Sequence, residues 1–220
     1  MEKSTVKARS TRQVSVSYMM LGIVFCTCLV TANLLETKLI DVGGFFTVTA
    51  GLLVFPISYI IGDVTTELWG FRGARRLIWT GFAMNFFTVA VCQVAVMLPA
   101  PDFWQGGDHF NFVFNMAPRI VVASLTAFVV GSLTNAWVMA AMRRRDGERR
   151  FSLRAIVSTL AGEGADSLIF FPMAFAGLVP AGELVVIMLM QVVLKTLYEI
   201  IVLPITLQVV KYFKRREGEA

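Results

Sequence analysis

The stretch FPISYIIGDVTTELWG, residues 55–70, carries an apolar run directly into two carboxylates, Asp63 and Glu67. On a helix these two residues lie one turn apart on the same face. Charged groups inside a membrane helix cost about 2.5–3.5 kcal/mol each on insertion scales, and they usually mark a functional site. The stretch therefore predicts a membrane helix whose end lies in a polar cavity.

The rest of the chain is also too apolar for a soluble domain. Of its 220 residues, 56% are hydrophobic and 16% are charged, and the mean hydropathy is +0.70. A spanning helix needs about 20 mostly apolar residues. Runs of about that length cover Val16–Leu35, Phe45–Asp63, Leu77–Leu98, Arg119–Met142, Leu153–Leu178 and Leu184–Val210. We predict an all-α, polytopic membrane protein with six transmembrane helices in residues 16–210, between tails at 1–15 and 211–220.

Basic residues gather on one side of the predicted membrane. They precede the first run and follow the second, fourth and sixth, and only Lys38, Arg119 and Lys195 fall elsewhere. Because positively charged loops stay in the cytoplasm, both termini are predicted to be cytoplasmic and the loop Pro99–Pro118 external. The net charge of +5 then reflects topology and contact with the lipid bilayer. We expect no nucleic-acid partner.

No catalytic or metal-binding motif is present in the sequence. His109 is the single histidine, and Cys26, Cys28 and Cys92 all fall inside apolar runs. The HExxH and GxSxG motifs and a Gly-rich phosphate-binding loop are absent. We therefore expect no metal, no cofactor and no enzymatic activity.

Polar residues inside the apolar runs are the candidate functional groups. Glu163 and Asp166 share one face of the fifth run, beside Gly162 and Gly164. Like charges at this spacing repel, which favours a ligand-binding or coupling role, and the glycines permit close backbone approach. The other candidates are Asn33, Asp63, Glu67, Arg119, Ser124, Gln191, Lys195 and Glu199.

Purely structural roles stay open for several of these residues. Asp63 and Glu67 also fit the cytoplasmic end of a helix, balanced by the arginines of the following loop. Lys195 and Glu199 fit an i,i+4 ion pair on one helix, and Arg119 fits the outer membrane interface. Small residues in the fifth run are compatible with a homodimer.

Four features resemble the queuosine precursor transporter family, also called the vitamin uptake transporter family. They are FPISYIIGDVTTELWGFRGARR at 55–76, RIVVASLTAFVVGSLTN at 119–135, LAGEGADSLIFF at 160–171 and Lys195 in the last helix. In the third segment, Gly162, Asp166 and Ser167 resemble the family's Gly-x-x-x-Asp-Ser motif. The resemblance runs from about residue 30 to residue 208.

The resemblance implies a six-helix importer of 7-deazaguanines, such as 7-cyano-7-deazaguanine, in the bacterial inner membrane. A carboxylate can accept hydrogen bonds from both donors on the Watson–Crick edge of such a base, and aromatic rings can stack on its faces. We expect a cavity between the second, fifth and sixth spans, with Arg119 and Lys195 offsetting its negative charge. The expected substrate-binding residues are Glu163, Asp166, Gln191, Asn33, Asp63, Glu67, Arg119, Ser124, Ser167 and Lys195.

Three functions remain open at this point. In the first, the chain is a self-sufficient transporter that moves deazaguanine bases by facilitation or by proton coupling. Alternatively, it is the substrate-binding subunit of a vitamin-type uptake system that needs a separate ATPase module. The third alternative is a membrane protein without transport activity, such as an assembly factor or a receptor.

Overall fold

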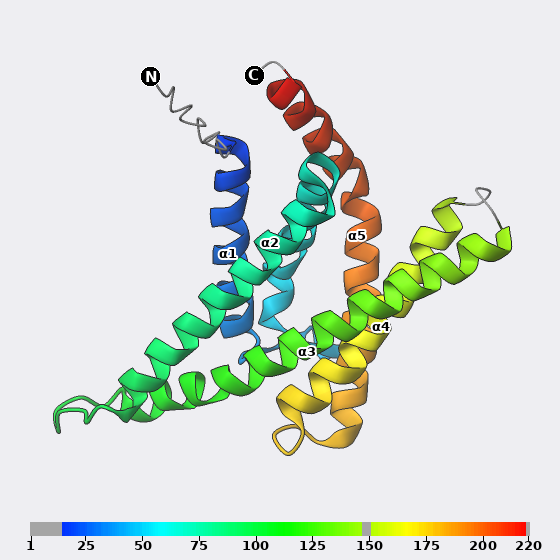
Figure 1. Ribbon diagram of the computed structural model, residues 1–220. Helices are drawn as coiled ribbons and strands as arrows, with labels where there is room; N and C mark the ends of the chain where they lie inside the picture. The colour runs from blue at the N-terminus through cyan, green and yellow to red at the C-terminus, as the bar shows by residue number, and fades with distance from the viewer. Residues whose placement is uncertain (1–14, 147–150, 219–220) are drawn as a thin grey trace, which may run out of the picture.

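The computed structural model describes residues 15–146 and 151–218, which form a helical bundle with one small sheet (Figure 1). Its elements are α1 (Val16–Leu35), β1 (Leu39–Val42), β2 (Phe46–Thr49), the 3-10 helix η1 (Ala50–Leu53), α2 (Phe55–Met97), α3 (Gly107–Asp146), α4 (Phe151–Phe175) and α5 (Ala181–Gly218). The start of α1 and the end of α5 lie at the same end of the bundle (Figure 1). Six of the basic residues that predict the topology lie outside the described residues. Four precede the first apolar run and two follow the fourth: Lys3, Lys7, Arg9, Arg12, Arg149 and Arg150.

Helix α2 consists of two arms that meet at Gly70. This residue has φ 68° and ψ 179°, a backbone conformation that glycine adopts without steric cost. Figure 1 shows the chain turning back at this point. The arm before Gly70 contains residues 55–63 of the second predicted span, and the arm after it contains the third predicted span except its last residue.

Four helical segments of the described chain are long and apolar enough to cross a membrane. They are Val16–Leu35, Phe55–Met97, Gly107–Val138 and Ala181–Phe213. Helix α4, which contains Glu163 and Asp166 near its middle, is not among them. Long apolar helices of this kind indicate a multi-pass membrane protein. The number of six crossings and the cytoplasmic position of the termini stay predictions.

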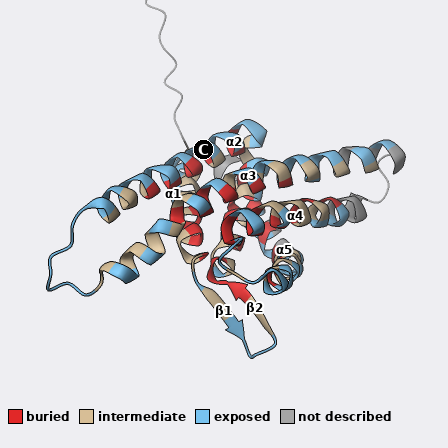
Figure 2. Ribbon diagram, turned by 90° about the horizontal axis from the view of Figure 1, so that it is seen from below, coloured by how far each residue is buried: buried red, intermediate tan, exposed pale blue. Residues whose placement is uncertain are grey.

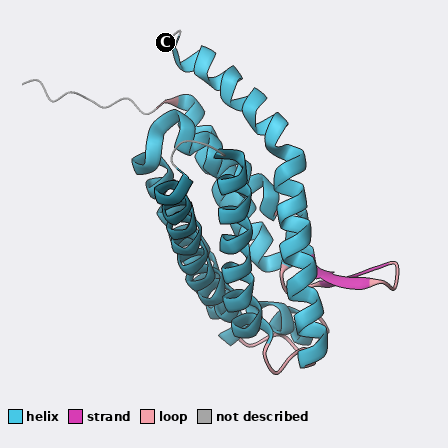
Figure 3. Cartoon of the chain, turned by 90° about the vertical axis from the view of Figure 1, so that its right-hand side faces the viewer, coloured by secondary structure: helices cyan, strands magenta, loops and turns pink. Residues whose placement is uncertain are grey.

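The structure corrects the start of the second predicted span. Instead of a helix from Phe45, strands β1 and β2 form an antiparallel hairpin in which Leu39 pairs with Thr49. Gly43 and Gly44 form the turn with φ 63° and 74°, as a tight hairpin turn requires. The β-branched and aromatic residues beside this turn favour strands. The helix therefore begins only at Phe55, and the fold is not purely α (Figure 3).

The structure also shortens the predicted external loop. Helix α3 begins at Gly107 and not after Pro118, which lies inside the helix. The rings of Phe110 and Phe114, one helical turn apart, have centroids 4.5 Å from each other. The sequence prediction ended the loop at Pro118 because proline usually marks a helix boundary, and the helical spacing of these aromatic residues overrides that signal. Proline is tolerated in membrane helices where neighbouring groups satisfy the freed carbonyl.

The buried residues concentrate where the five helices come together (Figure 2), in one cluster of α3, α4 and α5 and another of α1 and α2. There the backbones of α3 and α4 touch: a Cβ on Gly131 would lie 3.0 Å from the carbonyl oxygen of Gly162. Around Gly164, by contrast, there is open space. The predicted close approach is therefore confirmed for Gly162 but not for Gly164. Because Gly162 packs against α3 of the same chain, it offers no support for the homodimer with which the small residues of this run are compatible.

Candidate functional site

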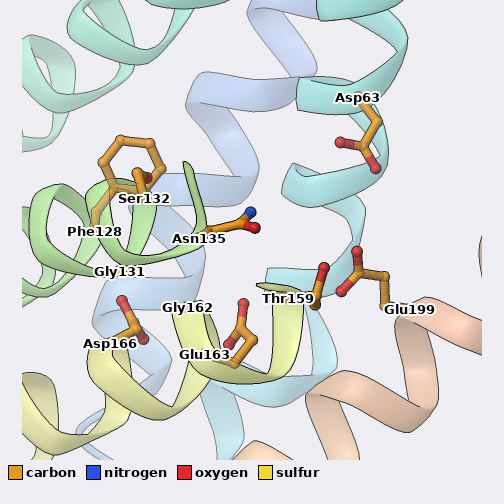
Figure 4. Close-up of a pocket in the computed structure, with 10 residues that line it drawn as sticks. All are labelled: Asp63, Phe128, Gly131, Ser132, Asn135, Thr159, Gly162, Glu163, Asp166 and Glu199. Carbon is orange, nitrogen blue, oxygen red and sulfur yellow. The ribbon is translucent and has the colours of Figure 1, made fainter. Parts of the chain in front are cut away.

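A polar cavity of about 130 Å³ lies between α2, α3, α4 and α5 (Figure 4). Four carboxylates line it, from Asp63, Glu163, Asp166 and Glu199. The amide of Asn135 points into the space between them (Figure 4). The remaining lining residues are Phe128, Gly131, Ser132, Thr159 and Gly162. The first carboxylate of the stretch 55–70 therefore faces a polar cavity, as its sequence predicts.

A second cavity, of about 230 Å³, adjoins the first; four phenylalanine rings lie among its lining residues, so we call it the aromatic cavity. The two cavities share Asp63, Phe128, Ser132, Asn135 and Asp166. The aromatic walls come from Phe25, Phe55, Phe82 and Phe128. The rings of Phe82 and Phe128 have centroids 5.6 Å apart and are tilted by 55°. The joined space thus offers both apolar ring faces and hydrogen-bonding groups.

Lys195 joins α5 to α4 at the edge of this space. Its Nζ lies 3.6 Å from Glu163 Oε2 and 3.4 Å from Asp166 Oδ2, and all three side chains are at most 15% exposed. The same ammonium lies 4.5 Å from the centre of the Phe55 ring. The ammonium of Lys195 thus pairs with two carboxylates of another helix. No salt bridge to Glu199 occurs among the described residues, so the i,i+4 interpretation is wrong.

A hydrogen-bonded chain extends from α5 to the hairpin. Gln191 lies one turn before Lys195 and is 1% exposed, and its Nε2 donates to Oγ1 of Thr49. The Thr49 hydroxyl in turn forms a hydrogen bond with the carboxylate of Glu36, the residue that follows α1. Gln191 therefore lies beside the cavities without lining either one. It connects α5 to β2 and, through Thr49, to the end of α1.

The structure brings some of the other predicted residues to the cavities and leaves others outside. Ser124 lines the aromatic cavity. Glu67 is exposed and lines neither cavity, although it lies one turn from Asp63. Asn33 and Ser167 are buried, and Asn33 Nδ2 and Ser167 Oγ have no hydrogen-bond partner within the described part of the chain. Neither lines the cavities.

Arg119 lies at a different place from the one that we expected. Its Nε donates to the carbonyl oxygen of Met173 at 2.5 Å, and its Nη2 donates to that of Ala176 at 2.7 Å. These carbonyls are at the end of α4, where intrahelical donors run out. The expectation that Arg119 offsets the charge of the cavity is therefore corrected: Lys195 does this, and Arg119 caps a helix.

Sequence reasoning missed the contribution of α3 and of the segment before α2. Ser132 and Asn135 lie on the face of α3 that also presents Gly131. A glycine one helical turn before the polar Asn135 is the sequence signal that could have indicated this face. Glu36 directly follows the first apolar run, so its position was readable as well. Thr49 gives no signal in the sequence, because it lies within the apolar run that predicts a helix where the structure has a hairpin. The cavity thus has α3 as a fourth wall beside the three expected ones.

Apolar helices around a buried, ion-paired polar cavity define a multi-pass membrane protein with an internal site for a small molecule. Sequence comparison supplies the family. The profile of the family described as "Putative vitamin uptake transporter" matches residues 49–209. This chain belongs to that family, whose curated relatives are named queuosine precursor transporters.

Three relatives show how far this similarity extends. A "Probable queuosine precursor transporter" of Bacillus subtilis is 28% identical over 80% of this chain and 76% of its own length. The "Queuosine precursor transporter" of Escherichia coli is 32% identical over 66% of this chain and 62% of its own length. A "Probable queuosine precursor transporter" of Haemophilus influenzae is 32% identical over 58% of this chain and 52% of its own length. No solved structure gives a significant match.

Proposed function

We propose that this protein imports 7-deazaguanine precursors of queuosine, such as 7-cyano-7-deazaguanine, across the bacterial inner membrane. The observation that carries the proposal is the joined cavity, which is lined by phenylalanine rings together with carboxylates and an amide. A flat heterocycle with polar edges needs both kinds of surface. The names of the relatives support the same substrate class.

Recognition of the base follows from the donors and acceptors at the polar side. A deazaguanine presents a ring N–H and a 2-amino group side by side, with a carbonyl next to them. In our proposal a carboxylate of Glu163 or Asp166 accepts from the two donors, and the Asn135 side chain donates to the carbonyl. Phe82 and Phe128 provide the stacking surface. Charge-assisted hydrogen bonds of this type are about twice as strong as neutral ones.

Lys195 allows these carboxylates to exist in a buried site. An unpaired carboxylate away from water carries a large desolvation cost, which an ion pair partly offsets. Lys195 pairs with both Glu163 and Asp166, so one ammonium serves two acceptors. In each carboxylate, the oxygen that does not face the ammonium is then available to a ligand, and its two lone pairs can accept from both donors of the base.

The direct test is uptake of radiolabelled 7-cyano-7-deazaguanine into proteoliposomes that contain this chain alone. We expect uptake that an excess of unlabelled compound abolishes and that liposomes without protein do not show. Uptake that requires an added ATPase module would support the alternative of a substrate-binding subunit. Binding without any uptake under both conditions would indicate a receptor, and neither binding nor uptake would remove the proposed substrate.

A further inference from the structure

Glu36 is a buried acid that the proposed recognition of the base does not use. It directly follows α1 and is 7% exposed. Its Oε2 has no hydrogen-bond partner within residues 15–146 and 151–218. A buried, ionised carboxylate with an unpartnered oxygen is costly, whereas the neutral acid is much less so. This position therefore favours a carboxyl group that holds a proton.

The surrounding backbone is shaped to hold the Glu36 carboxyl group. Any side chain at Gly51, in η1, would collide with the carboxylate and carboxyl-side methylene of Glu36. Thr49 binds the same carboxylate through its hydroxyl and is itself held by Gln191. Three separate elements, β2, η1 and α5, thus enclose or position one acidic side chain. Such a built environment distinguishes Glu36 from an acid that is buried by chance.

The charged groups that face Glu36 come from α4 and α5. They are Asp166 and Lys195, which both act on the carboxylate electrostatically. Lys195 is at the same time paired with Glu163 and Asp166, so three carboxylates compete for one ammonium. Burial raises the pKa of Glu36 to about 7, because it outweighs the hydrogen bond from Thr49 and the charge of Lys195, which lower the pKa.

We propose that Glu36 is a proton-binding site through which this protein couples substrate movement to the movement of a proton. A hydronium ion on one side of the membrane transfers a proton to Oε2 of Glu36, so its O–H bond breaks as the carboxyl O–H bond forms. On the other side the carboxyl O–H bond breaks and a water molecule takes up the proton. The proposal rests on the proposed transport function and adds the energy source to it.

The link to the substrate runs through Lys195. While Glu36 is neutral, the ammonium remains with Glu163 and Asp166, which line the cavity. When Glu36 loses its proton, it becomes a third anionic partner for Lys195 and weakens the hold of Lys195 on Asp166. A change in proton occupancy then changes the charge that the cavity presents to a ligand. By linkage, ligand binding must change the proton affinity of Glu36 to the same extent.

Two transport measurements on purified protein in proteoliposomes test the proposal, with 7-cyano-7-deazaguanine as the probe. Counterflow at equal pH on both sides reports transport itself, and accumulation under an imposed pH gradient reports coupling. We expect wild type to perform both. Glu36→Gln resembles the protonated acid, so we expect counterflow within about twofold of wild type and loss of gradient-driven accumulation above equilibrium. Glu183→Gln, which removes an exposed carboxylate of α5, should retain both.

The outcomes separate the two proposals. Absence of counterflow in wild type would overturn the transport function. Counterflow with accumulation that ignores the pH gradient, that follows a sodium gradient instead, or that survives in Glu36→Gln would overturn the proton site only. A third measurement does not depend on folding of a variant: the number of protons exchanged when wild type binds the probe in detergent. We expect a net exchange near pH 7, and zero exchange between pH 6 and 8 would also overturn the proposal.

Discussion

Lys195 Nζ lies 3.4 Å from Asp166 Oδ2, and this contact joins the last helix to α4 at the edge of the polar cavity. The two residues are 29 positions apart in sequence. Glu163 is the second partner of this ammonium, so Lys195 offsets the charge of two buried carboxylates in part. Removing one partner leaves an uncompensated charge in a region of low dielectric constant, whereas removing a peripheral charge does not.

We expect Lys195→Met to abolish uptake and to destabilise the protein by about 3–5 kcal/mol, the usual cost of breaking a buried ion pair from one side. Glu199→Gln should be much milder, because Glu199 forms no salt bridge with Lys195 in the described chain. Uptake in proteoliposomes and thermal unfolding in detergent measure the two effects. Equal, negligible effects of both substitutions would show that the ion pair contributes to neither transport nor stability.

Asp63 and Glu67 provide a matched pair, since they lie one turn apart on α2 but only Asp63 lines the cavities. We expect Asp63→Asn to weaken binding of 7-cyano-7-deazaguanine at least tenfold and Glu67→Gln to change it less than twofold. Equilibrium binding to purified protein is the measurement. A larger effect of Glu67→Gln than of Asp63→Asn would mean that the cavity described above does not hold the base.

The proposed acceptors of the base are tested by changing ligand and protein together. An analogue of 7-cyano-7-deazaguanine without the 2-amino group leaves a buried acceptor unpaired, and polar pockets can reject such ligands by as much as about 10⁴. We expect Asp166→Asn or Glu163→Gln to reduce this discrimination more than it reduces stability. If both variants keep the full preference for the 2-amino group, these carboxylates do not contact that edge of the base, and pairing with Lys195 is their remaining role.

Gly162 and Gly164 are a second matched pair, on α4. A Cβ at residue 162 would lie 2.9 Å from Cβ of Asn135 and 3.1 Å from the carbonyl oxygen of Gly131, whereas one at residue 164 meets open space. We expect Gly162→Ala to lower the free energy of unfolding by about 1–3 kcal/mol through overpacking. Gly164→Ala should raise it by up to about 1 kcal/mol, because alanine favours the helix. Thermal unfolding of the two variants side by side distinguishes these outcomes, and a similar response of both would contradict the close packing of α3 on α4.

Arg119 is expected to act on stability and not on ligand binding. Its two hydrogen bonds go to carbonyl oxygens at the end of α4, and the side chain is exposed, so we expect Arg119→Met to cost only about 1 kcal/mol. The dissociation constant for 7-cyano-7-deazaguanine should remain within about twofold of wild type. If Arg119→Met costs more free energy of binding than free energy of unfolding, Arg119 contributes to the substrate site after all.

The sequence determined the class of the protein and most of its helices. Apolar runs of spanning length can only be accommodated in a bilayer or a large buried core, and local chemistry made residues such as Glu163, Asp166 and Lys195 recognisable as exceptions within them. The same reasoning failed around Gly43 and Gly44. A short apolar run fits a buried strand as well as a helix, so only the two glycines of the turn indicate the hairpin.

The tertiary structure alone decided which polar residues meet. Lys195 could have paired with Glu199 on its own helix, and sequence spacing favoured that pair, but the packing of α4 against α5 places Glu163 and Asp166 closer to the ammonium. Arg119 and Glu67 looked equivalent to Lys195 and Asp63 as polar residues in apolar segments, yet they face away from the cavity. Helical periodicity fixes which residues share a face, whereas the contact between helices fixes what that face meets. That contact depends on non-local features such as the Gly131–Gly162 approach.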